Sequence, residues 1–336
     1  MIKMKCKRQS LTYKLIILIY ICLSIFGLVA CKDAIPPISK IEVHKDFSVN
    51  FLDVGQGDCI FIRLPDGKNM LIDCGVNDKH QENFKYVKSY LNQYNVSKLD
   101  YFVLTHPDLD HMGNAISLIN AFSIGTMYIP QIHQSQMQNF QHFSTLLEVI
   151  DQKQINYQIS IFPTTIFGLD YHFAFLSPQN DQRNSYDKLP TSNVPTGSDV
   201  NNLSPIIYFN CFGKRFIFTG DAEKQEERYV LDNFFSGVYD LYYGDLNIDL
   251  KDIDYLKLSH HGSEDASCEE FLTLLKPKNV IISVGNDNYY AHPSSETLIR
   301  IENICKTYSL YRTDSQGSIC IYKGEQDFIV KTAKNN

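Results

Sequence analysis

Four side chains that could bind a metal ion lie within six residues of one another, in the loop His106-Pro-Asp108-Leu-Asp110-His111. Side chains alternate along an extended chain, so positions 106, 108 and 110 face one way and position 111 lies beside them. Carboxylates this close repel one another unless a cation lies between them. Imidazole and carboxylate groups together bind divalent cations. The loop therefore predicts a metal site, in preference to a solvated acidic loop with incidental histidines.

Further polar groups follow other predicted strands in the same way. The apolar segment 99–104 predicts a buried strand that ends just before the metal loop. Two later predicted strands end just before Asp221 and before the pair His260 and His261. Because polar loops at strand ends often carry function, we expect these residues to meet.

The rest of the chain alternates strand and helix patterns. Apart from the strand at 99–104, predicted strands cover 48–53, 58–64, 69–73, 127–130, 158–161, 172–176, 205–210, 215–219, 254–258, 279–284, 318–322 and 328–330. Predicted helices cover 82–93, 115–121, 139–152, a segment after Asp221, a segment opened by a capping box at Ser267–Glu270, and 295–305. The stretch 179–203 is rich in Asn, Ser, Thr and Pro and predicts a long loop. This order indicates an α/β protein with sheets stacked face to face and helices outside.

The metal loop resembles the His-x-Asp-x-Asp-His form of the motif of the metallo-β-lactamase superfamily. Other segments resemble, in the same order, one branch of it: the hydrolase domain of the ComEC competence protein and its stand-alone relatives. These segments are 51–58 (Phe-Leu-Asp-Val-Gly-Gln-Gly-Asp), 71–75 (Leu-Ile-Asp-Cys-Gly), 218–221, 256–263 and 283–293. The resemblance covers 48–322 and implies an αββα sandwich of two mixed β-sheets flanked by helices.

By position, the resemblance implies six ligands for two divalent cations: His106 and Asp108 for the first, Asp110, His111 and His260 for the second, and Asp221 between both. We favour His260 over His261 because it directly follows its predicted strand. The superfamily often has a further histidine before the Gly-Asp strand, where this chain offers only Asn201, Asn202 and Ser204. One metal would therefore have fewer ligands. Asp221 could also cap the helix that follows it.

Several other residues have expected roles near the metals. His261 would act on the substrate, and His292 would stabilise or protonate the leaving oxygen. Asp58 would orient a metal-binding histidine. Asp73 would do the same, or cap a turn instead. The pairs Tyr242-Tyr243 and Tyr289-Tyr290 could stack on bases or sugars, but ordinary packing is the simpler interpretation in a chain with 21 tyrosines.

The ligands predict a hydrolase in which two cations activate a hydroxide for attack, with Asp110 essential to the most crowded ligand loop. Carboxylate ligands favour manganese or magnesium, and histidine keeps zinc possible. Two cations suit phosphodiesters, so the leading prediction is a phosphodiesterase or nuclease with a phosphodiester or nucleic-acid substrate. Alternatives are a lactonase or small-phosphoester hydrolase, and a non-catalytic surface binding lipoprotein. Asp108 in place of a histidine argues against a β-lactam hydrolase.

The beginning of the chain predicts export. Basic residues at 3–14 are followed by an apolar run at 15–29 and by Leu-Val-Ala-Cys31, which resembles a bacterial lipobox. An apolar run of this length is short for a membrane-spanning helix, although an uncut anchor helix is the alternative. We therefore expect an extracytoplasmic lipoprotein held to the cell membrane by a lipid on Cys31. The predicted boundaries are a signal peptide at 1–30, a tether at 31–46, a hydrolase domain at 47–331 and a tail at 332–336.

Charge and cysteine content limit the substrate and the type of metal site. Removing the five basic residues of the signal leaves 26 basic and 38 acidic residues, a net charge of −12. A basic groove that follows nucleic acid normally gives the opposite sign. The chain has no Cys-x-x-Cys pair to support a thiolate zinc site. In an oxidising compartment, disulfides that involve Cys268, Cys305 and other cysteines are an alternative that the sequence does not decide.

Overall fold

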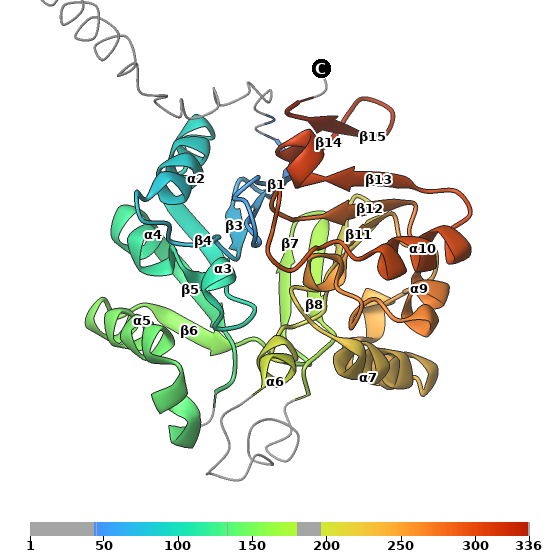
Figure 1. The fold of residues 1–336 in the computed structure, drawn as a ribbon, viewed down its shortest axis with the longest axis horizontal. Helices are drawn as coiled ribbons and strands as arrows, with labels where there is room; N and C mark the ends of the chain where they lie inside the picture. The colour runs from blue at the N-terminus through green and yellow to red at the C-terminus, as the bar shows by residue number, and fades with distance from the viewer. Residues whose placement is uncertain (1–43, 45, 133, 180–195, 335–336) are drawn as a thin grey trace, which may run out of the picture. The chain divides into compact units, whose positions relative to one another are not determined.

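Two β-sheets form the centre of the computed structural model, which describes residues 44, 46–132, 134–179 and 196–334 (Figure 1). The first sheet has eight strands in the order β15-β14-β1-β2-β3-β4-β5-β6. They are β1 (Ser48–Phe51), β2 (Ile60–Arg63), β3 (Asn69–Ile72), β4 (Lys98–Val103), β5 (Ser123–Ile129), β6 (Asn156–Ile159), β14 (Ile319–Lys323) and β15 (Phe328–Thr332). The strands from β15 to β3 pair antiparallel, and those from β3 to β6 pair parallel.

The second sheet has seven strands in the order β13-β12-β11-β10-β9-β8-β7. They are β7 (Thr165–Gly168), β8 (Tyr171–Phe175), β9 (Ile207–Cys211), β10 (Lys214–Phe218), β11 (Tyr255–Lys257), β12 (Asn279–Ile282) and β13 (Ser309–Arg312). Here β7 to β10 pair antiparallel and β10 to β13 pair parallel. Both sheets are therefore mixed, as the sequence predicts.

Helices cover the outer faces of both sheets (Figure 1). The α-helices are α2 (Glu82–Gln93), α3 (Leu109–Met112), α4 (Ala115–Ala121), α5 (Gln141–Gln152), α6 (Gly197–Asn201), α7 (Lys224–Phe235), α8 (Val238–Tyr243), α9 (Glu269–Leu275), α10 (Ser295–Ile304) and α11 (Thr313–Gln316). Short 3₁₀ turns are η1 (Gln134–Asn139), η3 (Gly244–Leu246) and η4 (Ser259–Gly262).

Three apolar cores hold these layers together. The core between the sheets includes Phe216 and Phe218 of β10, whereas the intervening Ile217 belongs to the core under α7–α10. This alternation follows from the two-residue period of a strand, and it explains why β10 is apolar throughout. A third core, which includes Phe102 and Leu118, lies between the first sheet and α2, α4 and α5. The layers form the predicted αββα sandwich.

Two local predictions about helix starts are wrong. Glu223, and not Asp221, is the residue that precedes α7. No capping box opens α9: its N-cap is Cys268, and the backbone N–H groups of Ser267 and Cys268 donate to the buried Glu227 carboxylate of α7. A tertiary partner has therefore replaced the local cap.

The predicted loop at 179–203 is partly wrong as well. Within its described part, a capping box between Thr196 and Asp199 opens the short helix α6. Strands β7 and β13 and the short helices α3, α8 and α11 were not predicted either. Predicted segment boundaries elsewhere differ from the observed ones by a few residues.

The described cysteines, including Cys268 and Cys305, are free and buried. Cys31 and the rest of residues 1–43 lie outside the described residues. In the part of the chain that the structure describes, every helix is too short or too polar to cross a membrane.

Candidate metal centre

Polar loops from both sheets meet where their parallel strands end. Asp73 follows β3, and the loop with His106 and His111 follows β4 in the first sheet. Asp221 comes after β10, and His261 after β11, in the second sheet. The carboxyl ends of these strands point toward the same region, so residues far apart in sequence form one cluster. The structure brings together all six predicted ligands and His261.

One carboxylate oxygen lies at the middle of the cluster. Oδ2 of Asp221 is 3.3 Å from Nε2 of His111 and 3.4 Å from Nε2 of His261. The same oxygen is 3.7 Å from Nε2 of His260 and 4.0 Å from Nε2 of His106. Four imidazole nitrogens from two sheets therefore surround a single, nearly inaccessible carboxylate.

Two further carboxylates divide the cluster into two groups. Asp110 Oδ2 lies 3.5 Å from Nε2 of His261 and 3.9 Å from Nε2 of His111. Asp108 Oδ2 lies 3.8 Å from Nε2 of His106. Asp110, His111 and His261 form one group of possible ligands, and His106, His111 and Asp221 form another. Asp108 lies beside His106, and His260 lies beside Asp221.

The other ring nitrogen, Nδ1, of each histidine is held by the protein. His111 Nδ1 is 2.8 Å from Asp73 Oδ2, and His261 Nδ1 donates to the Ser283 carbonyl at 2.7 Å. His106 Nδ1 is 3.2 Å from the Ser204 hydroxyl and 3.1 Å from the Thr105 hydroxyl. His260 Nδ1 is 3.4 Å from Glu223 Oε1. Such outer hydrogen bonds fix the tautomer and leave Nε2 free for a cation.

The adjacent histidines differ in burial and contacts. Both have left-handed backbone conformations, with φ of 46° at His260 and 53° at His261, so the chain turns tightly here. His261 is fully buried between Asp110 and His111, whereas His260 is partly exposed beside Glu223. The sequence-based preference for His260 assumed that the first residue after the strand points to the metals. The turn instead carries both rings to the cluster, and His261 is the one that contacts Asp110 and His111.

Asn201, one of the three residues considered for the place of a further histidine, lies beside His260. Its side-chain amide donates to Glu223 Oε1 at 2.8 Å and lies 3.5 Å from His260 Nδ1. Ser198 also donates to the Glu223 carboxylate. Asn201 and Glu223 therefore hold His260 from behind.

Sequence reasoning missed a buried lysine beneath the cluster. Lys257, in β11, has its Nζ 2.5 Å from Asp58 Oδ2 and 3.7 Å from Asp221 Oδ1. The same ammonium donates to the Gly220 carbonyl at 2.8 Å. Burial opposes its charge, but Asp58 and Asp221 raise the pKa of Lys257 above its usual value. Asp58, expected to orient a metal-binding histidine, is ion-paired with Lys257 and lies 3.7 Å from His261 Nδ1 and 3.9 Å from His111 Nδ1.

The free ligand atoms of the cluster fit divalent cations. His106 Nε2 and Asp221 Oδ1 are buried and have no hydrogen-bond partner among the described residues. Burial and the neighbouring Asp110 raise the pKa of Asp108 to about 6. Burial alone would lower the pKa of His261, yet Asp221 and Asp110 raise it to about 10. This excess of buried negative charge is what cations would neutralise.

His292 lies at the edge of the cluster, on the loop between β12 and α10. Its ring centre is 5.4 Å from that of His260, with the rings nearly perpendicular. Burial and the neighbouring His260 lower the pKa of His292 to about 4. The ring is therefore neutral at physiological pH and can donate one hydrogen bond.

The family model of the metallo-beta-lactamase superfamily matches residues 52–285, which include every candidate metal ligand but not His292. The chain belongs to the metallo-beta-lactamase superfamily. Its likeness to competence proteins, expected from the motifs, is confirmed by two relatives. ComE operon protein 3 of Bacillus subtilis (strain 168) is 28% identical over 284 residues, which cover 81% of this chain and 32% of the relative. Recombination protein 2 of Haemophilus influenzae is 26% identical over 256 residues, which cover 76% of this chain and 26% of the relative.

This superfamily member spans about a third or less of the length of those two relatives. Among solved structures, CmlA, a diiron β-hydroxylase from Streptomyces venezuelae, aligns with a TM-score of 0.49 at 11% identity. That alignment covers 83% of this chain and 54% of CmlA.

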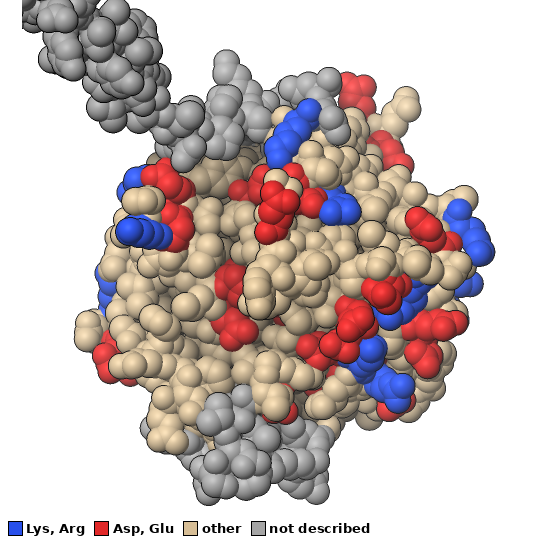
Figure 2. Space-filling model, in the orientation of Figure 1, with Lys and Arg blue, Asp and Glu red and all other residues tan. Residues whose placement is uncertain are grey.

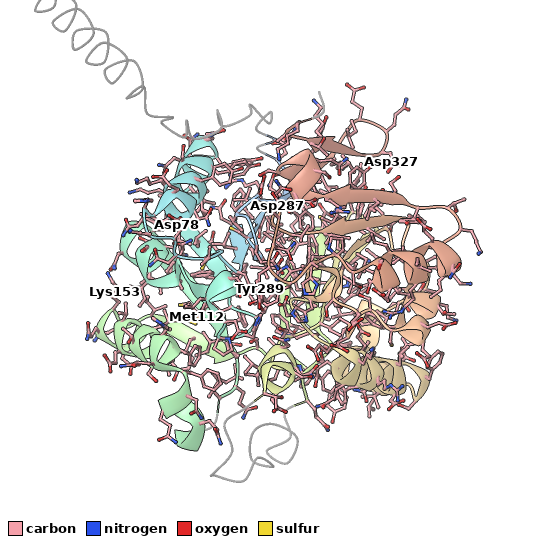
Figure 3. The ribbon with its side chains drawn as sticks, in the orientation of Figure 1. Asp78, Met112, Lys153, Asp287, Tyr289 and Asp327 are labelled. Carbon is pink, nitrogen blue, oxygen red and sulfur yellow. The ribbon has the colours of Figure 1, made fainter. Side chains whose placement is uncertain are left out.

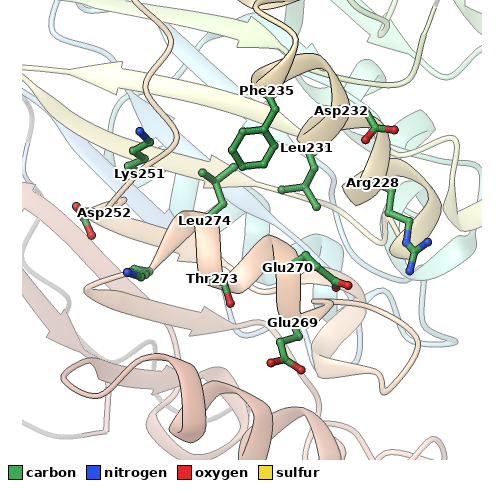
Figure 4. A pocket seen from close by; sticks show the side chains of 11 residues that line it. Arg228, Leu231, Asp232, Phe235, Lys251, Asp252, Glu269, Glu270, Thr273 and Leu274 are labelled. Carbon is green, nitrogen blue, oxygen red and sulfur yellow. The ribbon is translucent and has the colours of Figure 1, made fainter.

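One concavity of the described surface lies beside the metal-ligand cluster, and a larger one lies away from it. A cleft of about 600 Å³ adjoins His260 and is lined by α6 and the start of α7, including Glu223 and Lys224. A larger groove of about 1060 Å³ lies between α7 and α9, with Phe235 and Leu274 at its centre (Figure 4). No histidine lines that groove, so the metal chemistry belongs to the first region.

Proposed function

We propose that the protein is a phosphodiesterase or nuclease that holds two divalent cations between its β-sheets. The supporting observation is the position of Asp221, whose Oδ2 has four imidazole Nε2 atoms within 4.0 Å. His106, Asp108 and His260 would hold one cation, and Asp110, His111 and His261 the other, with Asp221 shared. This proposal adds His261 to the sequence-based ligand set and moves His260 to the first metal.

Charge counting supports two cations rather than one. The cluster and its supports contain six carboxylates and one buried cation, Lys257; the carboxylates are Asp58, Asp73, Asp108, Asp110, Asp221 and Glu223. With neutral imidazoles these groups sum to −5. Two divalent cations offset most of that charge, whereas a single one leaves a larger excess, which is costly where it is buried.

A pair of cations supplies an activated water and neutralises charge on the phosphate. The chain's own residues do the rest. Asp73 and Ser283 fix the orientation of His111 and His261. Neutral His292 would donate a hydrogen bond to the leaving oxygen at the edge of the cluster. Carboxylates dominate the described centre, so a phosphate could approach only after cations are bound.

The relatives' names favour nucleic acid as the substrate, since they denote competence and recombination proteins. The net charge of −12 expected after signal removal favours a short or single-stranded one that needs few distant phosphate contacts. We expect the logarithm of affinity to fall with the logarithm of salt at a slope equivalent to about one to three phosphates.

The direct test is metal analysis of the purified protein followed by assay on bis-p-nitrophenyl phosphate and a short single-stranded oligonucleotide. Asp110→Asn should lower kcat/KM by about 100-fold or more, because loss of a mere supporting residue already costs about 10- to 100-fold. Asp151→Asn, an exposed aspartate of α5, is the matched control and should leave activity unchanged. Failure of manganese, magnesium and zinc forms alike to cleave any phosphodiester would refute the proposal. Hydrolysis of lactones or small phosphomonoesters by the same preparations would then support the alternatives.

We also propose that Cys31 carries a lipid, which would place the enzyme on the outer face of the cell membrane. The support is the sequence alone: the basic start, the apolar run at 15–29 and the Leu-Val-Ala-Cys ending. In this proposal the protein is attached to the membrane by the lipid on Cys31 and not by a spanning helix.

A further inference from the structure

We infer that Tyr290, with Tyr289, forms a stacking platform for an unpaired nucleobase next to the phosphate that is cleaved. The inference rests on the proposed phosphodiesterase function and specifies its substrate as a phosphodiester with an unstacked ring beside the reacting group. The platform is made of exposed aromatic rings, which follow one another outward from the metal cluster.

The rings form a continuous series. His260, with its Nε2 3.7 Å from Asp221, has its ring centre 5.4 Å from that of His292. The His292 ring is stacked on Tyr290, with centres 5.7 Å apart and planes inclined by 17°. Tyr289 then stands almost perpendicular to Tyr290, at 85° and 5.7 Å. His292 therefore packs nearly parallel to Tyr290, and a ligand ring could occupy the part of Tyr290 that stays accessible.

Both tyrosines are strongly exposed: 96% of Tyr289 and 63% of Tyr290 are accessible. Figure 3 places Tyr289 near the middle of the molecular face shown there. In Figure 2 the middle of that face shows tan and red side chains, and the blue Lys and Arg side chains lie around it. A substrate that lands here meets aromatic rings and the cations' ligands, but no basic groove. Stacking is the interaction left to bind the part of the substrate beyond the reacting phosphate.

The loop that carries the platform is tied down although its rings are exposed. The Asn288 side chain donates to the carbonyls of Gly285 and His292 and accepts from the His292 N–H. Ser294 N–H donates to the Gly262 carbonyl, which ties the loop to the turn that carries His260. A Cβ at Gly262 would lie 2.5 Å from Pro293, so this turn and the loop are packed as closely as glycine allows. The backbone that carries the rings is therefore held next to the metal ligands, which lowers the cost of ordering a binding subsite.

This geometry favours single strands over duplexes. A base inside a duplex is already stacked on both faces and is unavailable to Tyr290 without unpairing. Base–aromatic stacking tolerates any sequence because every base has a π-face. The platform should thus select for an unpaired base but not for its identity.

The test compares three substrates with one phosphodiester each: thymidylyl-(3′→5′)-thymidine, and two analogues that each lack the base on one of the two sugars. Tyr290→Leu should lower kcat/KM on the complete dinucleotide by about 5- to 150-fold, the range for one base–aromatic stack. It should change kcat/KM on the analogue that lacks the stacked base by less than about twofold. Tyr290→Phe should retain the wild-type discrimination because it keeps the ring.

Tyr157→Leu is the matched control, since Tyr157 in edge strand β6 is 46% exposed and has no ring contact with another described residue. It should leave activity on all three substrates unchanged, and metal content should be the same in all variants. An equal loss on the complete and base-free substrates, or no loss on either, would overturn the inference while the proposed function stands.

If no metal form of the protein cleaves phosphodiesters, the proposed function fails. The stacking platform is then tested by a binding measurement alone. Fluorescence anisotropy of labelled pentathymidylate should then show weaker binding to Tyr290→Leu than to wild type and Tyr157→Leu. Equal binding to all three proteins would overturn it.

Discussion

Replacing Lys257 by methionine should destabilise the fold strongly, although it changes one side chain to another of similar length. The ammonium is fully buried, 2.5 Å from Asp58 Oδ2, and donates to the Gly220 carbonyl. Apart from this ammonium, the Asp58 oxygens have no hydrogen-bond donor within reach among the described residues. In the Lys257→Met variant that carboxylate would be left buried and unpaired, which costs about 3–5 kcal/mol. This is a large part of the 5–15 kcal/mol that is typical for a whole domain.

The measurement is urea denaturation in the presence of EDTA, so that metal binding does not contribute to the free energy of unfolding. The double variant Asp58→Asn with Lys257→Met should recover most of the loss, because it leaves no unpaired charge. Lys278→Met is the matched control: Lys278 Nζ is 2.9 Å from Asp254 Oδ1, but its side chain is 58% exposed. Its loss should cost about 1 kcal/mol or less. A cost below 1 kcal/mol for Lys257→Met, or a double variant less stable than the single one, would refute this reasoning.

Three further predictions concern metal content, pH and processing. The His261→Ala variant should lose about one of two bound cations, because the Nε2 atom of His261 lies between Asp110 and Asp221. Mass spectrometry of the bound metals measures this loss. A loss confined to His260→Ala would restore the assignment made from the sequence. Burial raises the pKa of Glu226 from 4.5 to about 8, so as the pH rises the unfolded chain releases this proton before the folded chain does. Between these two pH values the free energy of unfolding should therefore fall, by up to about 1.4 kcal/mol per pH unit. Glu226→Gln should remove that fall in denaturation curves at pH 5 and pH 8, and an unchanged pH dependence would contradict the assignment. Cys31→Ala should leave an unprocessed precursor without labelled lipid, and normal processing of this variant would exclude the lipid anchor.

The fold and the main ligand loop could be predicted because their signals are local. His106, Asp108, Asp110 and His111 are neighbours in sequence, directly after an apolar strand. The strands themselves alternate or are apolar throughout, according to whether one or both faces are buried. Such patterns need no knowledge of distant partners.

The remaining features depend on tertiary contacts. Which of His260 and His261 meets Asp110 depends on a left-handed turn that their residue types do not predict. The start of α9 depends on Glu227, some forty residues earlier in the chain. Lys257 did leave a signal, since a single lysine in an apolar strand must find a buried counter-charge. Its partner Asp58 could not be named before the two sheets were placed together.

The metal ligands come from both sheets, and this has a consequence for how the chain folds. His106 and His111 follow β4 of the first sheet, whereas Asp221 and His261 follow strands of the second. The first sheet also pairs β1 with β14, so it is complete only when residues near 320 have joined residues near 50. A half-folded chain can therefore present the ligands that follow one sheet, but it completes neither metal site. Cations would act as a late cross-link that closes the sandwich, and at a hundred times their dissociation constant they would add about 2.7 kcal/mol to its stability. Chelation should consequently speed unfolding by separating the sheets, rather than by loosening either sheet on its own.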